Sequence, residues 1–137
     1  MKIKKVYIFL CSFMCLMVLS GCGYLGPGNA DFHYDLSGKY KLFHSQGNFI
    51  FMEGGTEVAV DLEVIGIAWN DDFILAEQKI NNTSNYWIID VKNNKIYGPL
   101  NTASFDTKRS ELKIDQTLKL EKPEKYKYLD PSIKANK

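Results

Sequence analysis

Alternation of apolar and polar side chains between Glu57 and Val64 is the feature that most constrains the fold of this chain. Valine or leucine occupies every second position of this segment, and acidic or small residues occupy the positions between them. A period of two places the two kinds on opposite faces of a β-strand. The phase changes after Val64, because the apolar residues from Ile65 to Trp69 continue with the opposite parity. This change predicts either a β-bulge that uses Gly66 or the start of a second strand.

The rest of the chain is rich in strand-favouring residues, and turn signals separate the segments. The pair Asn93-Asn94 suits a hairpin turn, because asparagine tolerates positive φ. Further candidate strands cover residues 38–44, 49–52, 73–78, 86–91 and 95–97. We therefore expect a mainly β fold, with a single antiparallel sheet of about five to seven strands or, alternatively, a small closed barrel.

One short helix is expected after these strands, near residues 103–112. Gly98-Pro99 is expected to break the last strand, and Asn101 or Thr102 can then cap the helix. Phe105 is expected to face the sheet.

Composition divides the remaining sequence into a tether, a domain and a tail. Residues 22–34 begin with Cys22 and are rich in glycine, which is typical of a flexible tether. A β-rich globular domain is expected over residues 35–120, with Leu118 and Leu120 in a final edge strand. Residues 121–137 are rich in Lys, Glu and Pro, which predicts a mobile or loosely docked polar tail.

The amino-terminal segment has the order of parts found in bacterial secretion signals. Three lysines among residues 2–5 precede an apolar run over residues 6–18, which is shorter than the roughly 20 residues that span a membrane. Leu19, Ser20, Gly21 and Cys22 follow and resemble the lipobox of bacterial lipoproteins. The resemblance implies cleavage before Cys22 and a diacylglycerol on its thiol. We therefore expect a signal peptide over residues 1–21 and a lipid-anchored chain on the extracytoplasmic face of the cell membrane.

Charge and cysteine usage exclude several classes of function. Removal of residues 1–21 changes 17 basic against 16 acidic residues to 14 against 16. A nucleic-acid partner is therefore not expected, because it requires a strong basic excess. Cys11 and Cys15 leave with the signal and Cys22 carries the lipid, so no disulfide or catalytic thiolate is expected.

Few residues suggest catalysis or metal binding. His33 and His44 are the only histidines, and they lack the spacing of a metal-binding motif. Glu57, Asp61 and Glu63 share one face of their candidate strand, where they form a solvated row or, less commonly, an acid–base group. We expect no cofactor, no metal and no enzymatic activity.

Four aromatic residues lie close together in the hairpin region. Exposed, Trp69, Tyr86, Trp87 and Tyr97 could grip a sugar or a peptide with flat, rigid rings. Buried, they would form the core, which their apolar surroundings favour. They are the candidate residues for binding a partner, which would be an envelope protein, a peptide or a wall component.

Several short motifs are shared with a known family. They are Gly38, Tyr40 and Leu42, then Phe73 to Ala76, then Tyr86 to Asp90, then Gly98 to Leu100, and finally Phe105 and Arg109. With the lipobox, these motifs resemble a family of small uncharacterised lipoproteins from Gram-positive bacteria of low genomic GC content. The resemblance implies an extracytoplasmic location and supplies no catalytic residue.

Three functions are open at this point. The first is a non-catalytic binding or structural module of the cell envelope. The second is an immunity or inhibitor lipoprotein that blocks a toxin or hydrolase, for which the acidic row of Glu57, Asp61 and Glu63 would be the active face. The third is a small enzyme, which ranks last because no set of convergent polar residues is visible.

Overall fold

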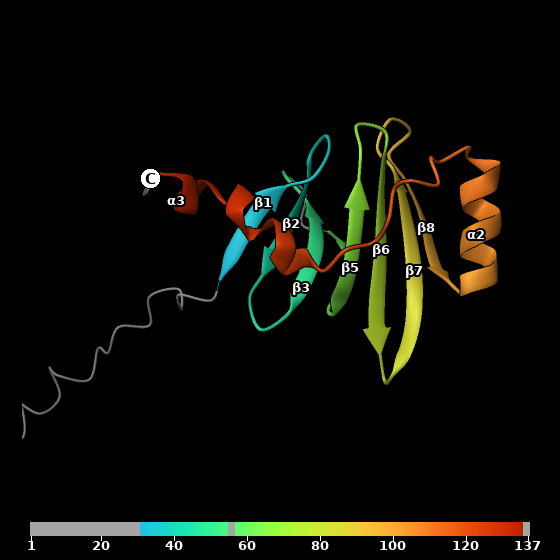
Figure 1. Ribbon diagram of the computed structural model, residues 1–137, viewed down its shortest axis with the longest axis horizontal. Coiled ribbons are helices and arrows are strands. Elements are labelled where there is room, and N and C mark those ends of the chain that lie inside the picture. Colours follow the sequence, from blue (N-terminus) through green and yellow to red (C-terminus); the bar gives the residue numbers. More distant parts are fainter. Residues whose placement is uncertain (1–30, 55–56, 136–137) are drawn as a thin grey trace, which may run out of the picture.

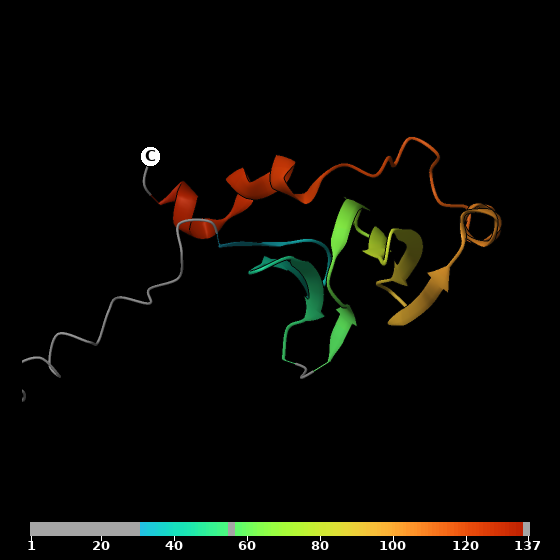
Figure 2. The same ribbon diagram turned by 90° about the horizontal axis from the view of Figure 1, so that it is seen from below.

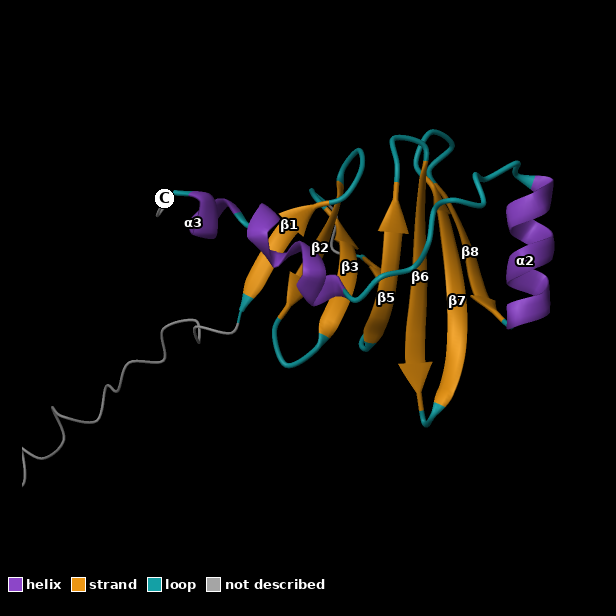
Figure 3. Cartoon of the chain, viewed as in Figure 1, coloured by secondary structure: helices purple, strands orange, loops and turns teal. Residues whose placement is uncertain are grey.

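The molecule contains two antiparallel sheets of four strands each. The two sheets lie side by side in Figures 1 and 3. The structure is a computed structural model, and it describes residues 31–54 and 57–135. In the first sheet, β1 (Phe32–Asp35), β2 (Tyr40–His44), β3 (Asn48–Met52) and β4 (Val58–Val60) follow one another in order. The second sheet contains β5 (Val64–Trp69), β6 (Phe73–Ile80), β7 (Thr83–Asp90) and β8 (Lys95–Leu100). The helical elements are α2 (Thr102–Glu111), the 3-10 helix η1 (Pro123–Leu129) and α3 (Pro131–Lys134).

The expected mainly β fold is confirmed, whereas the expected single sheet or closed barrel is wrong. The chain crosses from one sheet to the other between Val60 and Val64, inside the segment predicted as one strand. Leu62, which the alternation places in the core, is 43% exposed. The reason is the buried side chain of Gln78, whose Nε2 donates to the carbonyl oxygens of Asp61 (3.0 Å) and Leu62 (2.9 Å). These bonds satisfy the crossing backbone without a strand partner.

The change of phase after Val64 corresponds to both of the predicted alternatives. A new strand, β5, begins at Val64, and its register against β6 shifts between Val64 and Gly66. Ile65 lies in the shift and is 36% exposed, whereas Ile67 and Ala68 after it are buried in the two cores. The bulge therefore reconciles the two halves of the alternating pattern.

Two hydrophobic cores pack against opposite faces of the second sheet. The first core lies between the sheets, and the second lies between the second sheet and the helix α2 with the segment after it. Strands β6 and β7 contribute to both, because Ile74 and Ile89 face the first core while Leu75 and Ile88 face the second. Apolar residues at consecutive positions of a strand are expected where both faces are covered.

The local signals for hairpins and for the helix are confirmed, with one exception. Asn94 has φ of 50° in the turn between β7 and β8. Asn101 caps α2, since its Oδ1 accepts the backbone N–H of Ser104 at 2.8 Å, and Phe105 is buried. The exception is Gly98-Pro99, which does not end the strand. Strand β8 lies at the edge of its sheet, and its register against β7 shifts between Tyr97 and Leu100, so Pro99 stands opposite no residue of β7.

The carboxyl-terminal segment is packed against the sheets, which corrects the predicted tail and the domain limits of 35 and 120. Helix η1 contacts β1 and β5, as Figure 2 shows from below. Asp130 is 1% exposed and accepts the backbone N–H of His33 at 2.8 Å, so the folded unit already includes β1. Leu118 and Leu120 form no edge strand. An isolated bridge between Ile67 and Glu121 replaces it.

Candidate functional site

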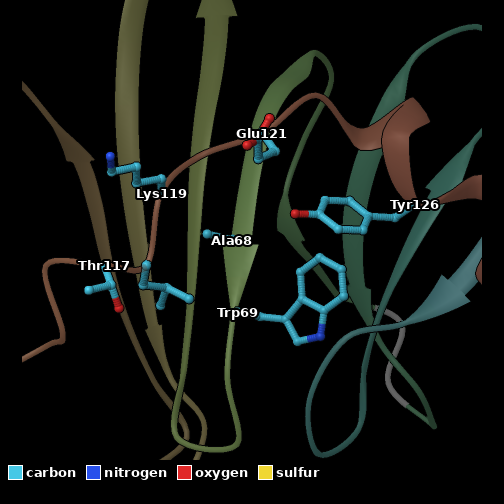
Figure 4. Close-up of a pocket in the computed structure, with 7 residues that line it drawn as sticks. Ala68, Trp69, Thr117, Lys119, Glu121 and Tyr126 are labelled. Carbon is cyan, nitrogen blue, oxygen red and sulfur yellow. The ribbon is translucent and has the colours of Figure 1, made fainter.

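An open groove lies beside β5, the edge strand of the second sheet, between that strand and the carboxyl-terminal segment (Figure 4). Its volume is about 350 Å³. In Figure 4, Trp69 and Tyr126 lie together on one side of β5, and Thr117 and Lys119 lie on the other side. Ala68, Leu118 and Glu121 complete the lining. The groove thus combines an aromatic wall with a hydroxyl, an ammonium and a carboxylate group.

The segment after α2 forms one wall of the groove because side-chain and backbone bonds hold it there. The guanidinium of Arg109 donates to the carbonyl oxygens of Asp115 (2.9 Å) and Leu118 (3.1 Å). Farther along, Ile67 and Glu121 exchange two backbone hydrogen bonds of 2.8 and 2.9 Å. Arg109, noted in the sequence as part of a shared motif, therefore shapes this wall.

Gly66 allows the segment after α2 to pass close to β5. A Cβ atom at this position would lie 3.4 Å from Cβ of Leu120 and 3.3 Å from Cβ of Glu77. The distance to Glu77 of β6 is tighter than usual for a Cβ atom, and the distance to Leu120 is at the short end of van der Waals contact, so a side chain at position 66 has little room. The absence of a side chain at Gly66 therefore lets the segment pack closely on the bulge of β5.

The aromatic wall is fixed by contacts with the first sheet. The rings of Trp69 and Tyr126 meet edge to face with centroids 4.7 Å apart. Behind them lies Tyr34, whose hydroxyl donates to the carbonyl oxygen of Pro123 at 2.9 Å. Burial, and then the charge of Glu124, raise the pKa of Tyr34 well above its usual range, so this hydroxyl remains a donor. The wall is therefore held from both the strand and η1.

The backbone of Trp69 directs its polar groups into the groove. Asn70 bonds with Phe73 across the β5–β6 turn, and Ala68 is the partner of Leu75 in the same ladder. In an antiparallel pair, alternate residues turn their N–H and C=O groups to opposite edges. The backbone N–H and C=O groups of Ile67 and Trp69 consequently point away from β6. Of these two residues, only Ile67 forms backbone hydrogen bonds with the carboxyl-terminal segment, through Glu121. Among the described residues, the backbone N–H and C=O of Trp69 thus have no strand partner on that side.

One family model matches the chain, over residues 37–125, and its description is "Protein of unknown function (DUF3997)". The chain belongs to this family. No curated protein and no solved structure matches the chain. The match covers β2 to β8, α2 and the groove residues from Ala68 to Glu121, whereas β1 and the groove residue Tyr126 lie just outside it. The predicted resemblance to a family of unknown function is confirmed to this extent.

The DUF3997 domain does not gather the four aromatic residues that the sequence singled out. Trp69 lines the groove, and Trp87 packs on the first core with Nε1 donating to Gln78 Oε1 at 2.9 Å. Tyr86 and Tyr97 instead pack on the second core, beyond the second sheet. All four side chains are partly exposed, and only Trp69 reaches the site.

Tyr126 is the site residue that sequence reasoning missed. It stands in the Lys- and Glu-rich segment that we interpreted as a tail. The signal available in the sequence was a pair of tyrosines, Tyr126 and Tyr128, in otherwise polar surroundings. Tyr128 is 59% exposed, so that signal alone does not identify which of the two is packed.

The acidic row and the histidines do not form a site with the groove. Glu57, Asp61 and Glu63 are exposed, but Glu57 precedes β4 while the other two lie in the crossing segment, so they do not share one strand face. His33 lies 3.7 Å from Asp130, and His44 Nδ1 is 2.8 Å from Asn48 Oδ1. Within residues 31–54 and 57–135, no group of three or more His, Cys, Asp or Glu residues could hold a metal ion.

The predicted signal and lipidation residues Leu19, Ser20, Gly21 and Cys22 lie outside the described residues. Among the helices of the described part of the chain, none is long and apolar enough to cross a membrane.

Proposed function

We propose that this protein is a lipoprotein, held on the extracytoplasmic face of a membrane by a diacylglycerol on Cys22, and that its DUF3997 domain is a non-catalytic binding module. The anchor is supported by the lysines, the short apolar run and the lipobox-like residues Leu19 to Cys22. The binding role is supported by the groove at Trp69.

The observation that carries the binding role is the open strand edge inside the groove. A partner in extended conformation can add its backbone to the N–H and C=O of Trp69 and place a side chain against the aromatic wall. Lys119, Glu121 and Thr117 supply polar partners at the rim. This geometry favours a peptide, either free, as part of an envelope protein or as the peptide portion of a wall component.

The anchor is tested by intact mass and detergent phase partitioning of the protein from native membranes, with Cys22→Ala as the control. We expect a product that begins at Cys22, is heavier by a diacylglyceryl group and enters the detergent phase. The Cys22→Ala variant should lose the lipid and remain in the aqueous phase. An uncleaved or unmodified wild type would refute the anchor.

The groove is tested by NMR, because the two tryptophans give two indole N–H signals. Titration with short extended peptides and with wall fragments that contain peptide stems should shift the Trp69 signal in a saturable way. The Trp87 signal serves as the internal control, since its N–H is bonded to Gln78. Equal shifts of both signals, or no shift with any of these ligands, would contradict binding at the groove.

A further inference from the structure

The outer face of the first sheet carries phenylalanines that belong to neither core. In β2 and β3, buried Leu42 and Ile50 alternate with Phe43, Phe49 and Phe51, which are partly exposed. Side chains on alternate positions point to opposite faces. The three phenylalanines therefore lie on the side of the sheet away from the first core, and neither core includes them among the residues that the structure describes.

These rings form one continuous surface with His33 of β1. Phe43 lies at the centre, with ring centroids 5.1 Å from His33, 5.9 Å from Phe49 and 4.8 Å from Phe51. The strand register explains the arrangement, because His33 is opposite Phe43 and Phe43 is opposite Phe49. We call these four residues the phenylalanine face.

A charged border marks one end of this face. Lys41 pairs with Asp35 at 3.3 Å and with Glu53 at 2.9 Å, and it stands opposite Phe51 in the register. Contiguous aromatic residues with a polar rim are typical of an interaction surface and not of a solvated sheet face. The helices of the described part of the chain pack elsewhere: η1 lies on β1 and β5, and α2 lies on β7 and β8.

The sequence connects the phenylalanine face to the proposed anchor. His33 follows the first residue of β1, and the chain from Cys22 to Phe32 reaches at most about 35 Å when fully extended. A lipid on Cys22 therefore keeps the start of β1, next to His33 of this face, within that distance of the bilayer. At such an effective concentration, weak insertion of a few rings is sufficient for docking.

We propose that the phenylalanine face docks on the surface of the lipid bilayer, an inference that rests on the proposed lipid anchor. Rings of this kind suit the boundary between head groups and acyl chains. Trp69 and Tyr126 pack against Tyr34, which is on the inner face of the first sheet. Docking by the outer face therefore leaves the groove uncovered.

A nitroxide label at position 33 tests this docking. The mature chain has no cysteine besides Cys22, whose sulfur would be blocked by the lipid. The lipidated full chain carrying His33→Cys is reconstituted into phosphatidylglycerol–phosphatidylcholine vesicles, and the accessibility of the label to oxygen and to a water-soluble nickel complex is measured. Ile96→Cys on β8 is the control, because Ile96 is an exposed apolar residue, at 42%, of the other sheet.

We expect the label at 33 to be accessible to oxygen and protected from nickel, with the reverse at 96. Adding Phe49→Glu should return the label at 33 to water although the anchor is intact, which separates docking from mere closeness to the tether. A lipidated protein whose label at 33 is as accessible to nickel as the label at 96 would overturn the docking and leave the anchor standing.

Two further outcomes also count against the proposal. Protection that persists in detergent without a bilayer, and that grows with protein concentration, would assign the face to a second copy of the chain. A protein whose intact mass lacks the diacylglyceryl group would remove the anchor and the docking together.

Discussion

Replacement of Gln78 by leucine is expected to weaken the junction between the two sheets. The side chain of Gln78 is 2% exposed and makes three hydrogen bonds. Two of them bind the carbonyl oxygens of Asp61 and Leu62 in the crossing segment. The third accepts the indole N–H of Trp87 at 2.9 Å. The Gln78→Leu substitution keeps the volume and removes every one of these bonds.

The expected loss of stability depends on whether water can replace Gln78 at each of its three former hydrogen-bond partners. A buried donor without a partner costs about 1–3 kcal/mol, and a typical bond contributes about 1 kcal/mol. The indole of Trp87 lies against the first core, whereas Asp61 and Leu62 are exposed enough for water to replace part of the loss. The added methyl groups return about 1 kcal/mol. We expect a net decrease of about 2–3 kcal/mol in the free energy of unfolding, or about 10–15 °C in Tm.

Urea unfolding followed by tryptophan fluorescence and circular dichroism measures this change. Gln116→Leu is the matched control, since Gln116 is exposed, and a change within about 0.5 kcal/mol is expected there. In a double-mutant cycle with Trp87→Phe, the two effects should be less than additive, because both remove the same bond. Equal midpoints for Gln78→Leu and wild type would refute the idea that these bonds hold the crossing segment.

Three other substitutions test the structure at separate places. Gly98→Ala should destabilise by about 2 kcal/mol in urea, because Gly98 has φ of 151° and a Cβ there would lie 2.5 Å from the ring of Trp87. Burial alone would raise the pKa of Asp130, but its hydrogen bonds with Ser132 and with the N–H of His33 lower it below the usual range. The ionised carboxylate of Asp130 therefore stabilises the fold above its unfolded pKa, and this contribution is lost as pH falls through the folded pKa. In the Asp130→Asn variant, the urea midpoint should depend less on pH over that acidic range. Asn101→Ala should lower the free energy of unfolding by about 1 kcal/mol and reduce helical circular dichroism, because α2 loses its cap. An unchanged helical signal would contradict a role for this cap.

Features set by neighbours in the chain could be predicted from the sequence. The turn at Asn93-Asn94, the cap at Asn101 and the bulge near Gly66 each depend on a few adjacent residues whose backbone preferences are known. The division into two sheets depends instead on Gln78, a residue far from the crossing segment that it stabilises. Periodicity gives no information about a side chain that bonds to a backbone elsewhere in the chain.

The groove was only half predictable for a similar reason. Trp69 stands out because it continues an apolar strand, whereas Tyr126 stands in a segment whose composition is that of a tail. Its packing follows from the burial of Pro123 and Asp130 on either side, and those contacts reach β1, near the other end of the domain. Composition therefore identified the strand side of the site and missed the side that comes from η1.

The phenylalanine face shows how one sequence pattern leads to two environments. Strands β3 and β6 both carry apolar residues at consecutive positions, over Phe49–Met52 and Phe73–Ala76. In β6 the pattern reflects burial on both faces, since one face meets the first core and the other meets the second. In β3 only the face of Ile50 meets a core. The second apolar face of β3 therefore has no counterpart within the described chain, and a surface outside the protein is what its phenylalanines are suited to contact.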